Sequence, residues 1–413
     1  MLSVCGVLAD HRGVVGYGCV NVEEGIIRSI TKLPRGERVL DYRTGALLLP
    51  GFVDLHVHLR GLQLAYKEDE LSGTAAAAAS GVTLVVDMPN TVPRLSSPEA
   101  VLLKLDALRA ASIVDYAVYA GIPDREEDVD RLLELPIAGF KVYPEDLEMR
   151  LEPLRKVLLS GSLVVVHAEL PEAEKAELCT GRCRDAHRGC HWEVAAVDTI
   201  MAQERRARLH VTHASCPDTV ELAKRRGATV DVTPHHLLLD PGEECTLTVN
   251  PPLRSAVARM GLLKQLLEGL VDALASDHAP HTSSEKLWPL CKPGISWLEA
   301  WPQLVYCLVR AGALTLGEYV ELVARGPSKI LSLEGIYGTL SPGARANIVV
   351  VREHLGRYVY KGISRGANRP YHLARTCMTV VATFVGGELV YSEGSVLERP
   401  RAVNPFQSGL QRR

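Results

Sequence analysis

The middle of the chain alternates short apolar segments, typical of buried strands, with longer segments typical of helices. Eight apolar segments are predicted as strands: 46–59, 82–89, 112–122, 137–145, 162–169, 208–215, 229–237 and 271–280. Helix-like stretches separate them, and several begin with the Ser or Asp residues that favour helix N-caps: 97–111, 124–136, 146–161, 193–207 and 218–227. This alternation predicts an α/β fold whose parallel strands close into a TIM-type (β/α)8 barrel of about 250 residues or more. Strands that are apolar on both faces agree with a sheet covered on both sides.

The two ends of the chain differ from its middle. Residues 1–48 and 337–413 hold short alternating runs separated by turn signals, a pattern typical of antiparallel strands. We expect both ends to pair into one small β-sandwich domain. That domain would flank a barrel formed by residues 49–336.

Charge and hydropathy exclude several function classes. The net charge of -3 shows no basic excess, which makes nucleic acid and anionic membranes poor default partners. No apolar run approaches the roughly 20 residues of a membrane span. The segment 1–13 lacks the basic and apolar regions of a signal peptide. We therefore expect a cytoplasmic protein with no nucleic-acid or membrane partner.

The cysteines fall into two groups. Five lie singly in apolar contexts and are interpreted as small buried hydrophobic residues: Cys5, Cys19, Cys216, Cys307 and Cys377. A cluster within 179–193 holds three more, with two histidines: Cys179, Cys183, His187, Cys190 and His191. A disulfide or free thiols are favoured there over a small zinc site. Asn and Gln are rare, at six each, which hints at a thermophile, where intracellular disulfides occur.

Polar side chains concentrate where the predicted strands end. The segment GFVDLHVHLRG carries His56, His58 and Arg60, and later strands contribute Lys141, His167, His213 and Asp277. Alternation along a strand places His56 and His58 on one face. A single histidine at a strand end is more often an ordinary core or surface residue. Four imidazoles and a carboxylate at the end of the barrel that carries active sites instead favour a divalent metal centre, with Zn²⁺ a suitable ion.

Lys141 lies inside an apolar strand, GFKVYPE, near these predicted ligands. A buried lysine loses its proton readily, and a neutral amine can add carbon dioxide to form an anionic carbamate that bridges two metal ions. The alternative is an ordinary ion pair with a carboxylate such as Asp54 or Asp87.

Several motifs in a fixed order carry a family resemblance: GFVDLHVHLR, YKEDELSGTAAAAASGVTLVVDMPNT, GFKVY, VVVHAE, HVTHAS, VTPHHLLLD, NPPLRS, SDHAPHT and KPGISWLEA. Through nearly its whole length the chain resembles the dihydroorotases, cyclic amidases of the amidohydrolase superfamily. The resemblance implies a (β/α)8 barrel with a small β domain. It also implies a hydrolase that reversibly cyclises N-carbamoyl-L-aspartate to L-dihydroorotate in pyrimidine biosynthesis.

The resemblance also implies roles for individual residues. His56, His58 and Asp277 would bind one metal ion and His167 and His213 a second, with carboxylated Lys141 bridging two ions, most plausibly Zn²⁺. Arg60, Asn90 and His281 would hold the substrate carboxylate, and Asn250 would lie near the pyrimidine ring. A hydroxide held between the two ions would be the nucleophile, and Asp277 would act as general base and then general acid.

Two rival functions are weighed against this interpretation. Dihydropyrimidinases, hydantoinases and allantoinases share the metal centre, but a ring without a carboxylate does not need the cation Arg60. An inactive dihydroorotase-like scaffold for a carbamoyltransferase would be expected to have lost metal ligands, and all six positions are present here. Homo-oligomerisation and association with aspartate carbamoyltransferase are left open.

Overall fold

The computed structural model describes residues 1–174, 179–397 and 402–407. Eight parallel strands form one sheet in the order β13-β12-β11-β10-β9-β8-β7-β6. Their bounds are β6 Phe52–Val57, β7 Val82–Asp87, β8 Asp115–Gly121, β9 Gly139–Val142, β10 Leu163–His167, β11 Arg208–Thr212, β12 Thr229–Val232 and β13 Ala273–Leu274. A parallel bridge between Val57 and His278 joins the first strand to the segment after the last. The predicted α/β barrel is confirmed.

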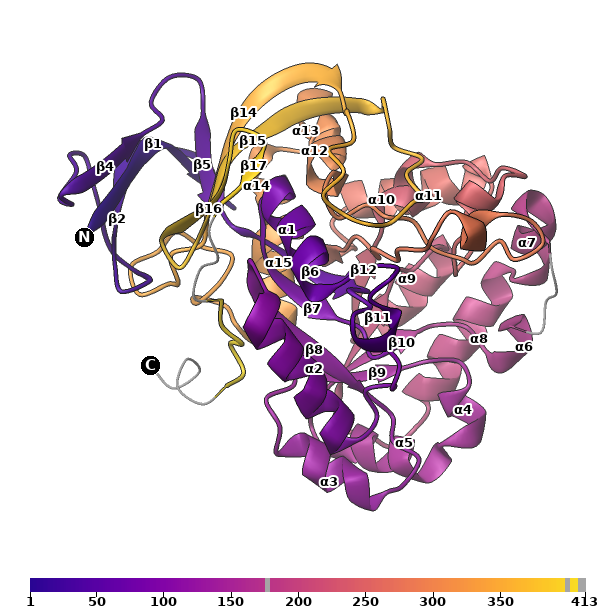
Figure 1. Cartoon of the computed structure of the whole chain (residues 1–413). Helices are drawn as coiled ribbons and strands as arrows, with labels where there is room; N and C mark the ends of the chain where they lie inside the picture. Colours follow the sequence, from indigo (N-terminus) through magenta and orange to yellow (C-terminus); the bar gives the residue numbers. More distant parts are fainter. Residues whose placement is uncertain (175–178, 398–401, 408–413) are drawn as a thin grey trace.

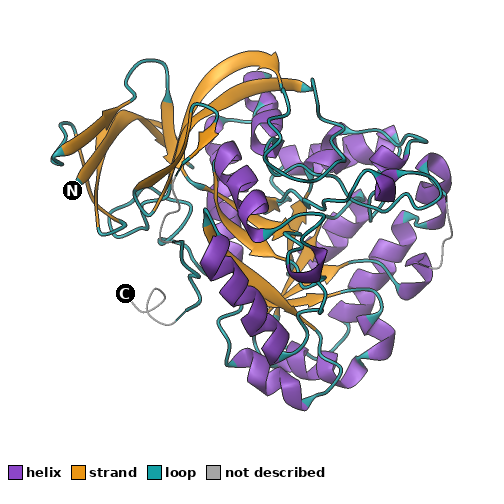
Figure 2. Ribbon diagram, viewed as in Figure 1, coloured by secondary structure: helices purple, strands orange, loops and turns teal. Residues whose placement is uncertain are grey.

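Helices surround the barrel strands (Figures 1 and 2). Their bounds are α1 Glu70–Ser80, α2 Pro98–Ala111, α3 Glu127–Leu133, α4 Asp146–Met149, α5 Leu151–Leu159, α6 Pro171–Glu174, α7 Gly181–His187, α8 Cys190–Met201, α9 Pro217–Arg225, α10 Pro234–Leu238, α11 Ala256–Leu267, α12 Trp301–Val305, α13 Cys307–Arg310, α14 Leu316–Val320 and α15 Gly326–Ile330. Short turns lie at η1 Leu62–Leu64, η2 Cys245–Leu247 and η3 Ser284–Lys286, and a π-helical turn, η4 Glu321–Arg325, joins α14 to α15. As predicted, Ser97 caps α2 by accepting a hydrogen bond from the Ala100 amide.

Both ends of the chain contribute strands to one mixed sheet, drawn indigo and yellow in Figure 1. The strands are β1 Leu2–Asp10, β2 Gly13–Glu23, β3 Ile26–Thr31, β4 Arg38–Asp41, β5 Leu47–Pro50, β14 Ile348–Arg357, β15 Arg375–Val385, β16 Glu388–Ser392 and β17 Ser395–Val396. Antiparallel pairing of β5 with β14 joins the two ends. Of the predicted small domain, residues 398–401 and 408–413 lie outside the described part.

The segment 46–59, predicted as one strand, is two strands that belong to different sheets. β5 pairs in the mixed sheet and β6 begins the barrel, with Gly51 between them. A Cβ on Gly51 would lie 2.2 Å from the Thr83 hydroxyl oxygen, so the chain can pass from one sheet to the other only at a residue without a side chain. The prediction of a single strand was wrong because both halves are equally apolar.

Two layers of apolar packing support the barrel. Side chains such as Val53, Leu84 and Val165 belong to one cluster that includes Leu331 and Tyr337. A larger cluster joins the other face of the strands to the helices through residues that include many of the alanines of α1. Burial on both faces explains why the strand segments are continuously apolar.

Five cysteines predicted to be isolated hydrophobic residues are instead paired. The disulfides are Cys5–Cys19, Cys190–Cys216, Cys245–Cys291 and Cys307–Cys377. The prediction was wrong because apolar context reports burial but not proximity: Cys5 and Cys19 face each other across the β1–β2 ladder. In the 179–193 cluster, Cys190 pairs outside it with Cys216, while Cys179 and Cys183 are free thiols, one of the predicted states.

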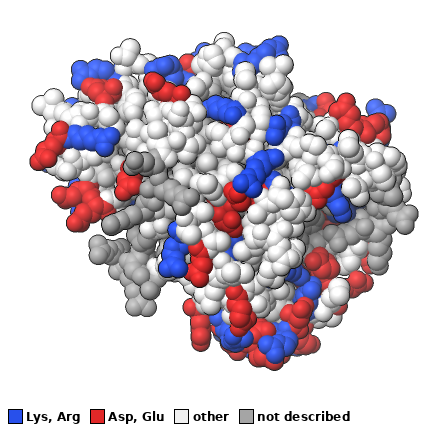
Figure 3. Space-filling model, viewed as in Figure 1, with Lys and Arg blue, Asp and Glu red and all other residues white. Residues whose placement is uncertain are grey.

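The distribution of charge on the surface agrees with the small net charge of the sequence. Lys and Arg side chains are interspersed with Asp and Glu on the face shown in Figure 3. Among the described residues, no helix is both long and apolar enough to cross a membrane.

Candidate metal centre and active site

A cavity of about 150 Å³ lies where the barrel strands end. Its wall is made by His56, His58, Arg60, Asn90, Lys141, Tyr143, His167, His213, Asn250, Asp277, Ala279, Pro293 and Gly294. All but one of the predicted site residues therefore meet at one place. The exception, His281, lies behind the wall, with its Nε2 3.4 Å from a terminal nitrogen of Arg60.

His56, His58 and Asp277 form the tightest cluster in this cavity. The two Nε2 atoms are 3.2 Å apart, and Asp277 Oδ1 lies 3.1 Å from that of His58 and 3.3 Å from that of His56. All three side chains are buried, and their candidate ligand atoms lie within 4.8 Å of one another. Burial lowers the pKa of both histidines, so their rings are neutral and keep the lone pairs that a metal ion needs.

Local structure turns these side chains toward the cavity. The register of β6 against β7 shifts between Asp54 and Val57, an irregularity of the kind that re-aims side chains beside active sites. The other ring nitrogen of His56 is 2.7 Å from Thr212 Oγ1, and that of His58 is 2.7 Å from Asn90 Oδ1. Such partners fix the orientation of metal-binding imidazoles. Asn90, predicted to touch substrate, thus also positions His58.

A second group of predicted ligands lies beside the first. The rings of His167 and His213 have centroids 4.5 Å apart, and His213 is 5.0 Å from His56 by the same measure. His213 Nδ1 is buried without a hydrogen-bond partner among the described residues. Burial, followed by the charge of His167, drives the pKa of His213 well below its ordinary value.

Lys141 points into the same cavity from β9, and its Nζ is buried with no hydrogen-bond partner in the described part of the chain. Burial lowers its pKa to about 7. The ion pairs considered from the sequence are not formed. Asp87 binds Lys104 at 3.0 Å, and Asp54 accepts hydrogen bonds from the backbone amides of His56 and Ser276.

Arg60 supplies a buried cation at the cavity wall. Its side chain is 6% exposed, and among the described residues no carboxylate lies within ion-pair distance of it. Its contacts are long: Nε lies 3.4 Å from the Pro280 carbonyl oxygen, and a terminal nitrogen lies 3.4 Å from His281. Burial and the charge of Arg60 hold the pKa of His281 at about 3, so His281 does not compete as a second cation.

Comparison with known proteins identifies the family. Residues 47–390 match the sequence profile of the amidohydrolase family. The chain belongs to that family. Two curated relatives of this amidohydrolase are similar through most of their length. The dihydroorotase of Aeropyrum pernix is 44% identical over 376 residues, or 87% of each chain. That of Saccharolobus solfataricus is 37% identical over 396 residues, or 94% of each chain.

Solved structures share the fold of this amidohydrolase. L-hydantoinase (dihydropyrimidinase) from Arthrobacter aurescens matches with a TM-score of 0.86 at 24% identity, covering 97% of this chain and 98% of that one. D-hydantoinase from Bacillus sp. AR9 matches with a TM-score of 0.87 at 21% identity, covering 98% of each chain. At these identities the structural similarity establishes the barrel and the mixed sheet. It does not identify the substrate, which has to be inferred from the side chains of the site.

Several side chains that support the amidohydrolase site were not found from the sequence. Lys104 is fully buried and its Nζ donates to the Arg60 carbonyl oxygen at 3.0 Å and to Glu70 at 2.7 Å. It therefore holds the backbone of Arg60, which lies in the left-handed region at φ 56°. Lys104 is in the middle of α2, far along the chain from Arg60, and no local pattern indicates this contact.

Glu169 and Tyr143 could have been found. Glu169 lies 2.7 Å from His167 Nε2 and accepts a hydrogen bond from Arg188 at 3.0 Å. Although burial opposes it, the hydrogen bond from His167 and the charge of Arg188 lower the pKa of Glu169 to about 2. Tyr143 lines the cavity, and its hydroxyl has no hydrogen-bond partner among the residues that the structure describes. Each is two residues beyond a predicted ligand, and strand alternation places such residues on the same side.

His235 and His236 begin a short helix rather than extending a strand. His236 Nε2 lies 3.0 Å from the Pro251 carbonyl oxygen, next to Asn250 at the cavity wall. His235 is buried, and its Nε2 is 4.0 Å from Asp277 Oδ2. The predicted strand 229–237 therefore ends earlier, at Val232, and both histidines lie in α10 beyond it.

Proposed function

We propose that this amidohydrolase is a dihydroorotase that interconverts N-carbamoyl-L-aspartate and L-dihydroorotate in de novo pyrimidine biosynthesis. The names of its curated relatives support this function. The observation that carries it is Arg60, a buried guanidinium at the wall of a cavity rich in metal-ligand side chains, with no carboxylate partner in the described part of the chain. Leaving a buried charge uncompensated is costly, so the site favours a ligand that brings its own negative charge.

The charge of Arg60 separates this proposal from its nearest rivals. Dihydroorotate carries a carboxylate on its ring, whereas dihydrouracil and hydantoin do not. A guanidinium binds a carboxylate through two parallel hydrogen bonds, which fixes both position and orientation. Asn90 and Asn250 line the same cavity and would complete the contacts to this ring, and His281 would support Arg60 from behind the wall.

The residues present fit a pair of divalent metal ions. His56, His58 and Asp277 would hold one ion, His167 and His213 the other, and a carbamate on Lys141 would lie between them. The neutral imidazoles support this assignment, as do His213 Nδ1 and Lys141 Nζ, which are buried without a hydrogen-bond partner within the described ranges. Zn²⁺ suits such a mixture of nitrogen and oxygen ligands. When bound, such ions acidify water and polarise carbonyl groups.

The chain's own residues then carry out positioning and proton transfer. Arg60 would orient the ring so that its amide carbonyl faces Asp277. In the hydrolytic direction, the Asp277 carboxylate would take a proton from the attacking water and deliver it to the departing ring nitrogen. In synthesis Asp277 would remove the proton from the carbamoyl nitrogen as that nitrogen attacks the side-chain carboxylate. It would then return the proton to the departing oxygen, which leaves as hydroxide and takes a second proton from solvent to become water.

The function is tested by an ultraviolet assay of ring opening with three substrates. We expect the purified full-length protein to hydrolyse dihydroorotate and to leave dihydrouracil and hydantoin essentially untouched. Turnover of either uncharged ring without turnover of dihydroorotate would overturn the proposed substrate. No turnover of any of the three by fully metal-loaded protein would favour the inactive scaffold.

Arg60→Met tests the contact that carries this proposal. The variant keeps the length of the side chain and removes its charge and donors. A hydrogen bond to a charged group contributes about 1.5–3 kcal/mol and each 1.4 kcal/mol is tenfold, so KM for dihydroorotate should rise roughly 10- to 100-fold. Metal content should be unchanged.

Arg365→Met is the matched control for Arg60→Met. Arg365 is exposed and donates to the Ala65 carbonyl oxygen, outside the cavity. Steady-state kinetics should show an unaltered KM for this control. An unaltered KM in Arg60→Met would remove Arg60 from substrate binding.

We also propose a cytoplasmic location. Disulfides such as Cys5–Cys19 are rare in the cytoplasm of most organisms, but intracellular proteins of hyperthermophiles are rich in them. The low content of Asn and Gln agrees with such a source.

A further inference from the structure

Three side chains outside the cavity form a second cluster of metal-ligand type on and before α7. Cys183 Sγ lies 3.6 Å from His187 Nδ1, and Cys179 Sγ lies 3.8 Å from the same atom. Cys183 and His187 are four residues apart on α7 and therefore lie on one side of it, and Cys179 precedes the helix. Cys179 and Cys183 are the free cysteines of the described chain, whereas the other eight are in disulfides.

The distances suit a tetrahedral zinc ion. With Zn–S bonds of about 2.3 Å and Zn–N bonds of about 2.1 Å, tetrahedral geometry separates sulfur from nitrogen by about 3.6 Å. The two observed separations are close to this value, and all three ligand atoms lie within 4.8 Å of one another. His187 Nδ1 is also 2.9 Å from the Cys183 carbonyl oxygen, a contact that metal binding would replace.

One carboxylate lies close to the thiols. Thr180 donates a hydrogen bond of 3.2 Å to Glu243 Oε2, which brings that carboxylate next to Cys179. Burial, the hydrogen bond with Cys183 and the nearby negative charges raise the pKa of Cys179 to about 11. A divalent cation would reverse this effect, because it favours both thiolates and attracts the carboxylate.

We propose that Cys179, Cys183 and His187 bind one Zn²⁺ ion, with Glu243 or a water molecule as the fourth ligand. Both thiols lose their protons to solvent as the ion binds, so two thiolates balance its charge. This site is separate from the cavity, whose candidate ligands are nitrogen and oxygen atoms. The inference goes beyond the proposed function and does not depend on it.

Arg184, another residue of α7, contacts the wall of the active site, which gives the ion a structural role. Arg184 donates to the Val249 carbonyl oxygen at 3.3 Å and to the side chain of Asn250. A helix of seven residues is marginal alone, so an ion bound to its outer side would stabilise it. It would thereby hold Arg184 against the loop that carries Asn250.

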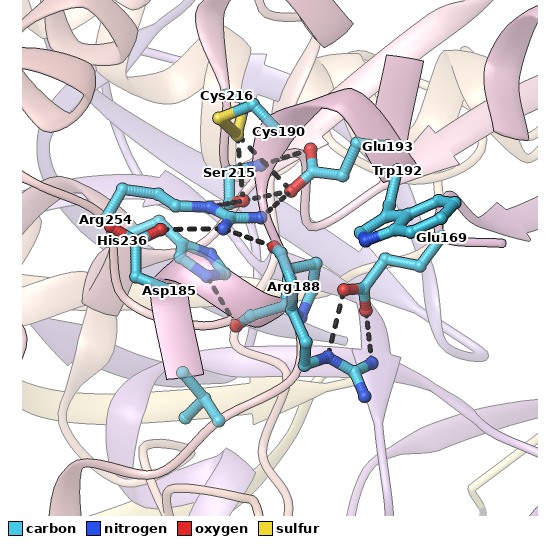
Figure 4. A network of polar contacts seen from close by, with 12 residues as sticks. Glu169, Asp185, Arg188, Cys190, Trp192, Glu193, Ser215, Cys216, His236 and Arg254 are labelled. Carbon is cyan, nitrogen blue, oxygen red and sulfur yellow. Dashed lines mark hydrogen bonds and ion pairs between the residues drawn. A yellow bond between two sulfur atoms is a disulfide. The ribbon is translucent and has the colours of Figure 1, made fainter. Parts of the chain in front are cut away.

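The same helix joins a buried polar network (Figure 4). Asp185 binds Arg254 at 2.8 Å, and Arg254 also donates to Ser215 at 2.7 Å. Arg188, which follows α7, binds Glu169, the partner of His167. A metal ion on α7 would therefore stabilise two parts of the cavity wall, the loop that carries Asn250 and the contacts behind His167.

Metal analysis of tag-free, full-length protein tests the site. After zinc loading and removal of loosely bound ions, wild-type protein should hold one equivalent of zinc more than Cys179→Ser/Cys183→Ser. His191→Ala is the matched control, because His191 is an exposed neighbour outside the cluster, and it should keep the wild-type content. Equal zinc contents in wild type and the double variant would overturn the proposal.

Cobalt substitution identifies the ligands independently. Wild-type protein and His191→Ala should show a thiolate-to-cobalt charge-transfer band that Cys179→Ser/Cys183→Ser lacks. The cavity cannot produce this band, since it offers no cysteine. If the double variant does not fold, a thiol-specific mercurial added to wild-type protein should release one equivalent of zinc as two thiols react. Absence of both band and release, or a Cys179–Cys183 disulfide in protein purified without oxygen, would overturn the site.

Discussion

Lys141→Ala is expected to lose nearly all activity together with much of its bound metal. The substitution removes the buried Nζ that lies among the candidate ligands without a hydrogen-bond partner in the described residues, and with it the proposed bridging carbamate. Metal ions supply several kcal/mol of transition-state stabilisation and each 1.4 kcal/mol is tenfold, so kcat/KM should fall about 1,000-fold or more. Metal analysis and steady-state kinetics measure both effects.

A small carboxylate such as acetate should restore part of the activity of Lys141→Ala, because it can enter the space of the missing carbamate and offer the same two oxygen atoms. The matched control is Lys264→Ala, which removes an exposed lysine that pairs with Glu268 at the end of α11. That control should keep wild-type activity and metal content, because Lys264 is not among the residues that line the cavity. Lys141→Ala with wild-type activity and metal content would exclude the bridging role. Intact mass measured under native conditions should show one bound carbon dioxide in wild-type protein that Lys141→Ala lacks.

Asp277→Asn is expected to lower kcat by about 100- to 10,000-fold, the range contributed by general acid–base catalysis. Asparagine nearly matches aspartate in size and can still place an oxygen near His56 and His58, which Asp277 Oδ1 contacts at 3.3 and 3.1 Å. It cannot accept and return a proton. The loss should therefore fall on kcat more than on KM, with part of the metal retained.

Kinetics and metal content measured on one preparation separate these effects. Asp106→Asn makes the same chemical change on the exposed side of α2 and should behave as wild type. If Asp277→Asn kept full metal content and a kcat within tenfold of wild type, Asp277 could not be the group that transfers the proton. Complete loss of metal would instead assign it a mainly structural role as a ligand.

Much of the fold could be predicted because short stretches of the sequence indicate which residues are buried. Strands covered on both faces must be apolar throughout, and helices between them need caps and one apolar side. The strand boundaries were harder to predict. The segment 46–59 belongs to two sheets, and the chain changes sheet at Gly51, which lies close to the Thr83 side chain. Nothing within the segment indicates that change.

Much of the candidate site could be predicted for a related reason. Ligand side chains interrupt apolar strands at their ends, so His56, His58, His167 and His213 stand out against their surroundings. The contacts that hold these side chains do not stand out. Lys104, which binds the Arg60 backbone, lies in a different element of the chain. In the sequence, a buried lysine within a helix cannot be distinguished from a lysine on the exposed side of that helix.

The cysteines show the same limit. Their apolar surroundings predicted burial correctly for residues such as Cys5 and Cys19 but could not show that the two face each other. Likewise, the cluster of Cys179, Cys183 and His187 could be noticed in the sequence. Only the structure separated it from Cys190, which turns inward to Cys216.

The sequence by itself therefore determined the barrel, the end of the barrel that carries the site, and the identity of the candidate ligands. Each of these depends on the alternation of apolar and polar residues over a few positions. The periodicity of strands and helices decides which of these side chains face the core and which face away from it. The tertiary structure alone decided which distant side chains meet: the neighbours of Arg60, the partners of the cysteines and the support behind His167. Those contacts arise only when the barrel closes, because closure sets distances between segments that have no relation in the sequence.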